Sequence, residues 1–364
     1  MADLHTLARL ARSFRPVPGR DAVLLHLGRD VDIGGYEAGI NVRSALLLAC
    51  LLGMGGAEVH ADLGPSHGRQ WWRLHYPGQR WSPVPRRACR FGLVVTDSPD
   101  RVECRHDVLW RVDYRMAPPA ADDGATVHLP YPMSPMVLEQ GGLERLESVR
   151  GGRRPIRILF AGHFERAHYD RPDVHERRFG KRNRWALLEH LRAGGRTVEP
   201  ASRADLERLL SEGVGRKGIV VVDAARLPVA PREWLALVAK ADFFFCPPGR
   251  IMPPCHNLVE ALAVGTIPIT NAPEWFWPVL GDGRECLAFD STAALDRAVD
   301  RAQAMTEAEV AGMRATAIDY HDRHLDLRRI AHGLAARRRE PLRLTLVDET
   351  LHRVEALPVT EERP

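Results

Sequence analysis

The segment from residue 241 to residue 278 restricts the possible fold of this chain more than any other part of the sequence. It begins with a mainly apolar stretch, Asp242–Cys246, that is typical of a buried strand, and continues into a loop rich in Pro and Gly, Pro247–Cys255. A helix starting near His256 and a second short strand, Ile267–Thr270, follow. This order predicts one βαβ unit of a parallel sheet, and such sheets bind ligands at the loops after the carboxyl ends of their strands.

Three motifs occur in order within this segment: C-P-P-G at the end of the first strand, N-L-V-E-A-L in the helix and G-T-I-P-I at the second strand. Their order and spacing resemble the donor-nucleotide segment of exostosin-type glycosyltransferases, and the resemblance extends through Trp275, Phe276 and Trp277. That family has the GT-B fold, in which this segment lies in the C-terminal domain. The resemblance implies an α/β chain with two Rossmann-like domains facing a cleft, in which a sugar passes from a nucleotide-activated donor to an acceptor hydroxyl.

The helix after the loop is suited to a nucleotide. Its first backbone N–H groups are free to face an anion, and the helix dipole favours negative charge there. The resemblance implies that Glu260, about one turn inside the helix, accepts hydrogen bonds from a ribose. The family usually has a basic residue three positions before this Glu, whereas this chain has Asn257. Either another residue such as Arg250 meets the pyrophosphate charge, or donor binding is altered. The alternative is an ordinary βαβ unit in which Glu260 is a solvated helix residue.

A second candidate binding segment begins at the predicted strand Ile156–Phe160. The strand ends in a loop with Gly162 and His163, and Arg182 and Arg184 precede a predicted helix over residues 185–192. Exostosin-like proteins have a comparable loop and basic residue, and the resemblance matches that residue to Arg184. A guanidinium there can bind phosphate oxygens through two parallel hydrogen bonds. The alternative is a solvent-exposed Arg, which the helix dipole disfavours at this end.

The N-terminal half also begins like a Rossmann domain. A strand, Ala22–Leu27, a Gly-rich loop, a helix, Val42–Leu52, and a strand, Glu58–Ala61, follow one another. The glycines of the loop do not have the G-x-G-x-x-G spacing, so an NAD enzyme is possible but not favoured. Further strands are predicted at Phe91–Thr96, Val108–Val112 and Thr126–Leu129.

Carboxylates in the first Gly-rich loop are the candidate catalytic groups. An inverting transferase needs a base that takes the proton of the acceptor hydroxyl, and Asp32 and Glu37 are the candidates, with Asp97 at the end of a later strand as the next choice. The Asp30-Val-Asp32 pair also allows metal binding, but its place inside the first loop argues against a metal. Helix capping by Asp32 is an equally simple interpretation.

The chain length of 364 residues is that of two domains. A charged, Gly-containing stretch at residues 147–154 indicates the linker. We therefore expect an acceptor-side domain at residues 1–150, a nucleotide-sugar domain at residues 151–340 and a tail at residues 341–364 with one possible strand, Arg343–Val347. The GT-B resemblance implies that a late helix crosses back to the N-terminal domain.

Composition excludes some functions. The net charge of +4 is small for this length and argues against nucleic acid as a partner, although residues 151–200 contain twelve Lys and Arg against six Asp and Glu. No secretory signal or membrane-spanning apolar run is visible, and the six cysteines lack zinc-finger spacing. These features predict a cytoplasmic protein with no integral membrane segment and no metal.

The sequence therefore favours a glycosyltransferase that needs no cofactor besides its nucleotide-sugar donor and that acts on a glycan or another hydroxyl acceptor. Many retaining GT-B enzymes carry a pair of Glu residues that this chain lacks, with Met252 eight positions before Glu260, which favours inversion or a different retaining geometry. Two alternatives stay open: an epimerase or hydrolase of nucleotide sugars on the same fold, and a nucleotide-binding protein without turnover.

Overall fold

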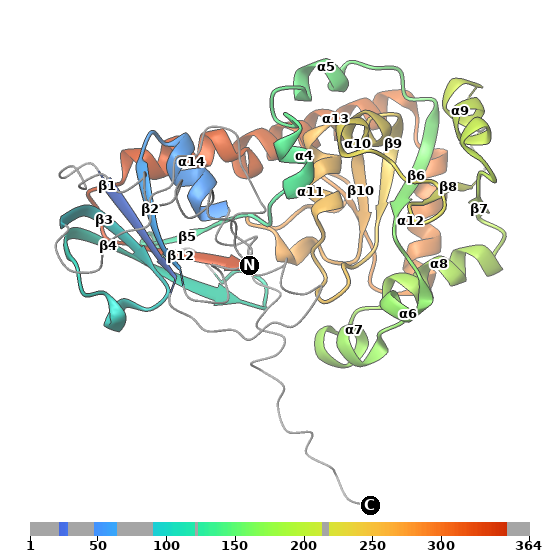
Figure 1. The fold of residues 1–364 in the computed structure, drawn as a ribbon. Coiled ribbons are helices and arrows are strands. Elements are labelled where there is room, and N and C mark those ends of the chain that lie inside the picture. Colours follow the sequence, from blue (N-terminus) through green and yellow to red (C-terminus); the bar gives the residue numbers. More distant parts are fainter. Residues whose placement is uncertain (1–21, 28–46, 64–89, 121–122, 213–217, 348–364) are drawn as a thin grey trace, which may run out of the picture. The chain divides into compact units, whose positions relative to one another are not determined.

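The chain forms two compact units, each built on its own six-stranded sheet (Figure 1). Unit 1 consists of Met1–Leu129 and Leu327–Pro364, and unit 2 consists of Pro130–Asp326. The computed structural model describes residues 22–27, 47–63, 90–120, 123–212 and 218–347. Among the helices in these ranges, none is both long and apolar enough to cross a membrane.

The sheet of unit 1 is parallel throughout, with the strand order β2-β1-β3-β4-β12-β5. Residues 47–54 are helical and connect β1 to β2 as a crossover between neighbouring parallel strands. The strands are β1 (Ala22–Leu27), β2 (Glu58–Leu63), β3 (Arg90–Thr96), β4 (Arg105–Arg115), β5 (Thr126–His128) and β12 (Leu342–Val347), with a short 3-10 helix, η2 (Pro99–Arg101), after β3.

The last described helix, α14 (Leu327–Ala336), belongs to unit 1. It approaches the turn after the helix of residues 47–54 so closely that a Cβ built on Gly55 would lie 3.1 Å from the carbonyl oxygen of Ala331. Trp110 of β4 is fully buried, and its Nε1 donates to the carbonyl oxygen of Glu340 at 2.8 Å. These contacts attach the C-terminal part of the chain to the N-terminal sheet.

The sheet of unit 2 is also parallel, with the order β11-β10-β9-β6-β8-β7. Every residue of β9 is buried, as expected of a parallel strand covered on both faces. The strands are β6 (Ile156–Gly162), β7 (Thr197–Val198), β8 (Ile219–Asp223), β9 (Ala241–Cys246), β10 (Ile267–Thr270) and β11 (Leu287–Ala288).

Helices cover both faces of this second sheet (Figure 1). On one face, Phe243 and Phe245 of β9 pack in a core with apolar residues of α8, α12 and α13. On the other face, Phe244 contacts Trp234 of α10 with ring centroids 6.2 Å apart. The helices of unit 2 are α4 (Pro135–Glu139), α5 (Leu146–Arg150), α6 (Arg166–Tyr169), α7 (Pro172–Phe179), α8 (Arg184–Ala193), α9 (Arg203–Glu212), α10 (Pro231–Val238), α11 (His256–Ala263), η3 (Pro273–Trp275), α12 (Thr292–Ala304), α13 (Glu307–Tyr320) and the π-helical η4 (His321–Leu325).

Two parallel, Rossmann-like α/β units in one chain confirm the expected fold class, that of the GT-B fold. The late crossing back to the N-terminal domain is also found, because the chain leaves unit 2 at Asp326 and α14 belongs to unit 1.

The compact units divide at residues 129/130 and 326/327, whereas the sequence suggested 150/151 and 340/341. Residues 147–154 lie within unit 2, where Arg150 Nε donates to the carbonyl oxygen of Ala263 at 2.8 Å and Arg154 Nη1 donates to Thr266 Oγ1 at 2.7 Å. The expected tail contributes β12, which pairs with both β4 and β5 and is therefore a strand of the first sheet.

Candidate functional site

Three neighbouring strands of unit 2 end at the same edge of the sheet. The order β10-β9-β6 places the ends of these parallel strands side by side. Gly162 ends β6, the loop of residues 247–255 follows β9, and Asn271 follows β10. Loops at this edge of a doubly wound sheet form its usual ligand site. We call this region the unit 2 edge.

Helix α11 begins at the unit 2 edge with an N-terminus that no side chain caps. Its N-cap residue is Cys255, whose side chain makes no capping hydrogen bond, and its first turn contains no acidic residue. The first N–H groups of a helix have no partner within the helix, and the helix dipole places partial positive charge there. The sequence predicted this start at His256, and the structure confirms it.

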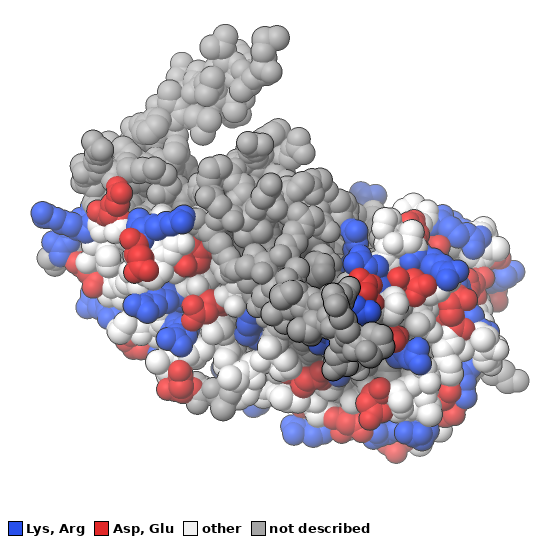
Figure 2. Space-filling model, turned by 90° about the horizontal axis from the view of Figure 1, so that it is seen from below, with Lys and Arg blue, Asp and Glu red and all other residues white. Residues whose placement is uncertain are grey.

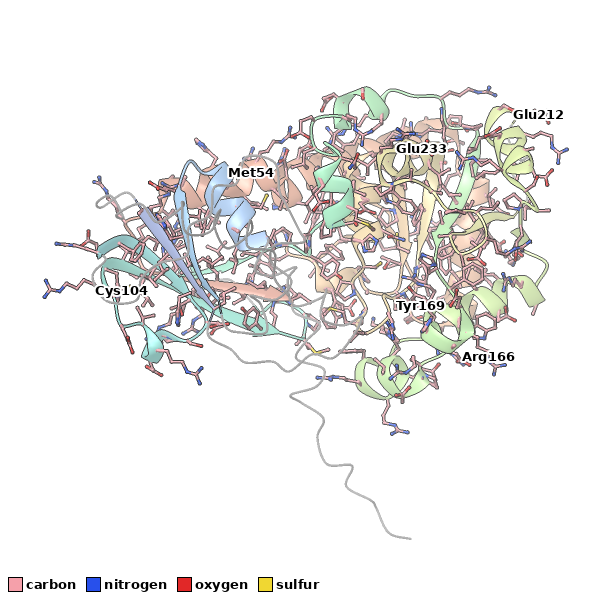
Figure 3. All side chains as sticks on the ribbon, in the orientation of Figure 1. Met54, Cys104, Arg166, Tyr169, Glu212 and Glu233 are labelled. Carbon is pink, nitrogen blue, oxygen red and sulfur yellow. The ribbon has the colours of Figure 1, made fainter. Side chains whose placement is uncertain are left out.

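Arg184, the first residue of α8, is buried with only 4% of its surface exposed. Its Nε donates to the carbonyl oxygen of Pro248 at 3.0 Å, its Nη1 to that of His163 at 2.7 Å, and its Nη2 to Cys255 Sγ at 3.5 Å. The guanidinium carbon also lies 4.4 Å from the ring centroid of Tyr169 on α6, which is labelled in Figure 3. One side chain thus joins the loops after β6 and β9.

The charge of Arg184 has no carboxylate partner among the described residues. A buried charge without a counter-ion is costly, although two carbonyl oxygens and an aromatic face offset part of this cost. Arg184 is therefore not the solvent-exposed Arg that the sequence allowed as an alternative. From its buried position, the Arg184 guanidinium contributes positive electrostatic potential at the unit 2 edge.

Gly162 lies close to both Asn257 and Arg184. Gly162 has φ +150°, and a Cβ at this position would lie 3.5 Å from Asn257 Nδ2 and 3.8 Å from Arg184 Nη1. Asn257 is buried and donates from Nδ2 to the carbonyl oxygen of Ala161 at 3.3 Å. Asn257 therefore fixes the end of β6 and supplies no charge. The side chain of His163 is exposed, and the structure uses only its carbonyl oxygen.

Glu260 is fully buried on α11. One carboxylate oxygen accepts from the backbone N–H of Ser134 at 2.9 Å, and the other accepts from Trp234 Nε1. Burial raises the pKa of this carboxyl group above its usual value, and the two donors act in the opposite direction. Glu260 holds the start of α4 and helix α10 to α11. Its contact with a ribose stays a prediction. To accept from a ribose, the carboxylate would have to give up its hydrogen bonds to Ser134 and Trp234.

Arg182 and Arg250 complete the predicted set. Arg182 is exposed, with Nη1 3.5 Å from Glu176 Oε1, and its carbonyl oxygen accepts from Asn271 Nδ2 at 3.4 Å. Arg250 is partly exposed, and its carbonyl oxygen accepts from Nε2 of His175 at 3.2 Å.

His175 on α7 is a residue of this region that the sequence analysis did not identify. It is buried, its Nδ1 has no hydrogen-bond partner, and burial lowers its pKa to about 4. Together with Arg184, it fastens carbonyl groups of the loop of residues 247–255. Most residues of α7 are charged or polar and His is not an apolar residue itself, so the sequence pattern did not indicate a buried side chain at this position.

The excess of Lys and Arg in residues 151–200 does not produce a continuous basic surface. Several of these cations pair with local carboxylates, among them Arg171 with Asp173, Lys181 with Glu274 and Arg192 with Glu199. On the face that Figure 2 shows, basic and acidic side chains are interspersed over the described surface.

Asp32 and Glu37, the candidate bases, lie outside the described residues. Asp97 directly follows β3, and its carboxylate accepts from Ser98 Oγ at 2.9 Å and from Tyr114 OH at 3.1 Å. It therefore lies at the carboxyl edge of the unit 1 sheet. No group of three or more His, Cys, Asp or Glu that could hold a metal ion occurs in the part of the chain that the structure describes.

No protein-family model matches the sequence, and no curated protein matches it. Solved structures with a similar fold include the N-terminal domain of Candida albicans trehalose-6-phosphate phosphatase, with 7% identity, a TM-score of 0.44 and coverage of 89% of this chain and 97% of that chain. HepE of Anabaena in complex with UDP-glucose has 9% identity, a TM-score of 0.41 and coverage of 86% and 98%. An α,α-trehalose-phosphate synthase (UDP-forming) from Burkholderia vietnamiensis has 12% identity, a TM-score of 0.41 and coverage of 88% and 97%. Similarities at this level do not identify a shared activity.

Proposed function

We propose that this chain is a glycosyltransferase that moves a sugar from a nucleotide-activated donor to an acceptor hydroxyl, and that the unit 2 edge binds the diphosphate of the donor. The observation that carries this proposal is the uncapped N-terminus of α11 beside the buried guanidinium of Arg184, which has no carboxylate partner in the described structure. Both features favour an anion at the same edge.

The chemistry of sugar transfer requires such an environment. Negative charge grows on the departing nucleoside diphosphate, and fixed N–H dipoles can stabilise it without reorganising. Backbone N–H groups at the start of α11 can bind phosphate oxygens directly. Arg184 acts through its charge and through the loop that it holds, because three of its five N–H groups already donate within the protein.

The other predicted residues take roles consistent with their surroundings. Arg182, Arg250 and His163 have side chains that are at least partly exposed at this edge and can reach a ligand. Asn257 and Glu260 hold the surrounding elements together. Asp32 or Glu37 is the proposed base, with Asp97 as the next candidate. The closer relation to exostosin-type enzymes, chemistry without a metal and a cytoplasmic location are further parts of this proposal.

A thermal-shift screen with UDP, GDP, CDP, ADP, TDP and CMP tests the binding step. A ligand at about 100 times its dissociation constant stabilises the native state by about 2.7 kcal/mol. We expect one nucleoside diphosphate to raise the melting temperature, and its sugar derivatives to release that diphosphate when an acceptor is added. A screen in which no nucleotide stabilises the protein would contradict the proposal.

The variant Arg184→Gln tests the charge. We expect it to weaken binding of the nucleoside diphosphate much more than binding of the matching nucleoside, because only the diphosphate is an anion. Arg192→Gln, on the same helix but paired with Glu189 and Glu199, is the matched control. Equal losses for both ligands would make Arg184 purely structural.

The uncharged Asn257 favours one alternative, a protein that binds nucleotides without turnover. Its amide occupies the position where exostosin-like enzymes usually have a cation, and it is already bonded to Ala161. Tight nucleotide binding with neither transfer nor hydrolysis of any donor would favour this alternative. Acceptor-independent epimerisation of a nucleotide sugar would instead favour an epimerase.

A further inference from the structure

The side-chain oxygen of Asn271 is buried without a hydrogen-bond partner. Asn271 directly follows β10 at the unit 2 edge and has only 2% of its surface exposed. Its Nδ2 donates to the carbonyl oxygen of Arg182 at 3.4 Å, while its Oδ1 receives no hydrogen bond. Because a carbonyl oxygen can only accept, this contact fixes which end of the amide is the oxygen. Within the described residues, no other Asn or Gln has a buried side-chain atom without a partner.

The segment that carries Asn271 is packed firmly against its surroundings. Lys181 Nζ lies 2.8 Å from Glu274 Oε1, and the ring of Trp275 meets that of Phe179 edge-on, with centroids 5.5 Å apart. These contacts join the segment after β10 to α7 and to the residues between α7 and α8. The unpaired oxygen is therefore held in place by its neighbours. A buried polar group without a partner is costly, and native proteins rarely keep one unless a ligand, an ion or ordered water satisfies it.

The chemistry of an amide oxygen restricts what can satisfy it. Such an oxygen accepts hydrogen bonds and cannot donate one. The ionised oxygens of a diphosphate are acceptors as well, so they cannot pair with Asn271 Oδ1. The group that pairs with it must be a hydroxyl or an N–H. The unit 2 edge thus offers two kinds of contact, N–H donors for an anion at the start of α11 and one acceptor for a neutral donor group after β10.

The two faces of the unit 2 sheet separate Asn271 from the residue expected to contact the nucleoside. That residue is Glu260, whose carboxylate accepts from Trp234 of α10, and α10 covers the face on which Phe244 lies. Asn271 is bonded to Arg182, just before α8, and α8 packs on the opposite face. In a nucleotide sugar, the diphosphate links the nucleoside to the sugar. A donor whose nucleoside lies on the Glu260 side therefore brings its sugar toward Asn271.

We propose that Asn271 is a specificity-determining residue of the donor site, and that its Oδ1 accepts a hydrogen bond from a hydroxyl of the transferred sugar. This inference rests on the proposed glycosyltransferase function and extends it to the sugar. The buried oxygen is satisfied only when a sugar is attached to the diphosphate. Asn271 therefore contributes to the affinity for the nucleotide sugar and not to that for the free nucleoside diphosphate, which distinguishes the donor from the nucleotide product.

The test is isothermal titration calorimetry of the full-length protein with UDP, GDP, ADP and TDP and with UDP-glucose, UDP-N-acetylglucosamine, GDP-mannose, ADP-glucose and TDP-glucose. Asn271→Leu has nearly the same shape and lacks the acceptor. We expect it to weaken binding of the best nucleotide sugar about tenfold and to leave the affinity for the matching diphosphate within about twofold. Thr270→Val, which removes a buried hydroxyl from the adjacent residue, is the matched control and should change neither affinity.

Analogues of the best nucleotide sugar with one hydroxyl replaced by fluorine give a complementary measurement, because fluorine cannot donate a hydrogen bond. One analogue should bind the wild type about tenfold more weakly than the parent does, and should bind Asn271→Leu as tightly as the parent does. If the variant does not fold, the wild-type series decides alone. A series in which no position matters overturns the proposal.

The remaining outcomes separate this inference from the proposed function. Equal losses for the diphosphate and the nucleotide sugar in Asn271→Leu overturn the inference and leave the anion site standing. Unchanged affinity of Asn271→Leu for every nucleotide sugar also overturns it and assigns the oxygen to an ordered water. A wild type that binds none of these nucleotides contradicts the proposed function, and this inference with it.

Discussion

At the scale of single residues, the unit 2 edge is organised by buried polar side chains that are hydrogen-bonded within the protein. Arg184 donates to carbonyl oxygens of two loops, Asn257 donates to the end of β6, and Glu260 accepts from α10 and from the start of α4. Each of these hydrogen bonds pairs a backbone or side-chain group that would otherwise be buried without a partner, at a cost in free energy. Their first role is to fix the positions of the loops and helices to which a ligand would bind.

Glu260→Gln separates a structural role from a ligand contact. Both carboxylate oxygens accept hydrogen bonds, so a Gln must turn its NH₂ group toward either Ser134 N–H or Trp234 Nε1–H. An unsatisfied buried donor costs about 1–3 kcal/mol, so we expect the free energy of unfolding to fall by about 2 kcal/mol in urea titration. The control is Glu233→Gln on α10, whose exposed carboxylate pairs with Arg203 and is labelled in Figure 3. Unchanged stability with weakened nucleotide binding would instead support the ribose contact.

His175 should make the stability of unit 2 depend on pH. Its pKa in the folded chain is lowered from 6.5 to about 4, chiefly because burial disfavours the charged form. Between these values the unfolded chain binds the extra proton and the folded chain does not. The free energy of unfolding therefore falls as the pH falls from about 6.5 to about 4, by up to about 3 kcal/mol, and this contribution is constant below that window.

The comparison that isolates this effect is between the wild type and His175→Gln. Carboxylates also titrate in acid, so only the difference between the two pH profiles reports on His175. We expect the variant to have a shallower slope between pH 6.5 and pH 4. His190→Gln, on α8 beside Asp296, is the control at a more exposed His. Parallel profiles for the wild type and His175→Gln would show that His175 does not carry the effect.

At the scale of elements, the sequence predicted most strands and helices closely. The predicted Ile267–Thr270 strand and the helix start at His256 agree with the structure, because apolar runs and Pro- and Gly-rich loops mark them locally. Helices α6 and α7 were missed because residues 165–180 are largely polar. The sequence also did not indicate that Arg184 is buried. Its hydrogen-bond partners, at residues 163, 248 and 255, are distant in the sequence and come close to it only when the sheet has formed.

The start of α8 offers a test of how this element supports the unit 2 edge. Asn183 is its N-cap, is buried, and accepts from the backbone N–H of Ala186 at 2.9 Å. Ser291 caps α12 in the same way, accepting from Ala294 at 3.2 Å at an exposed position. Each cap contributes about 0.5–2 kcal/mol, and we expect Asn183→Ala to cost more than Ser291→Ala because water can replace only the exposed cap. Isothermal unfolding of both variants measures this.

Because Arg184 directly follows Asn183, only Asn183→Ala should also weaken binding of a nucleoside diphosphate. Equal effects of both variants on stability and on binding would show that the cap of α8 has no particular role in nucleotide binding.

At the scale of the whole molecule, unit 1 is built from two separate stretches of the chain. Its first 129 residues form five of the six strands, and the sixth, β12, comes from beyond residue 340. The sequence predicted this strand but assigned it to a tail, because strand pairing over more than 200 residues leaves no local signal. Asp32 and Glu37 fall within the residues assigned to the same unit, so the candidate bases and the candidate donor site belong to different units of the chain.

Ending the chain at residue 340 should unfold unit 1 and spare unit 2. The truncation removes β12 from between β4 and β5, and with it the buried side chains of Leu342, Leu344, Leu346 and Val347. Burying each such side chain contributes about 1.5–3 kcal/mol, so the loss is comparable with the whole stability of a typical domain, about 5–15 kcal/mol. Every strand of unit 2 lies within Pro130–Asp326 and is unaffected by the cut.

Hydrogen exchange followed by mass spectrometry distinguishes the two units in one sample, because exchange protection reports local stability. In the truncated chain, we expect amides of β1, β3 and β4 to lose protection, while amides of β6, β8 and β9 keep it. A chain ending at residue 348 is the matched control, since it retains all of β12 and should protect both sheets. Full protection of β3 and β4 in the shorter chain would mean that β12 only covers the first sheet and that the first 129 residues with α14 are sufficient for its stability.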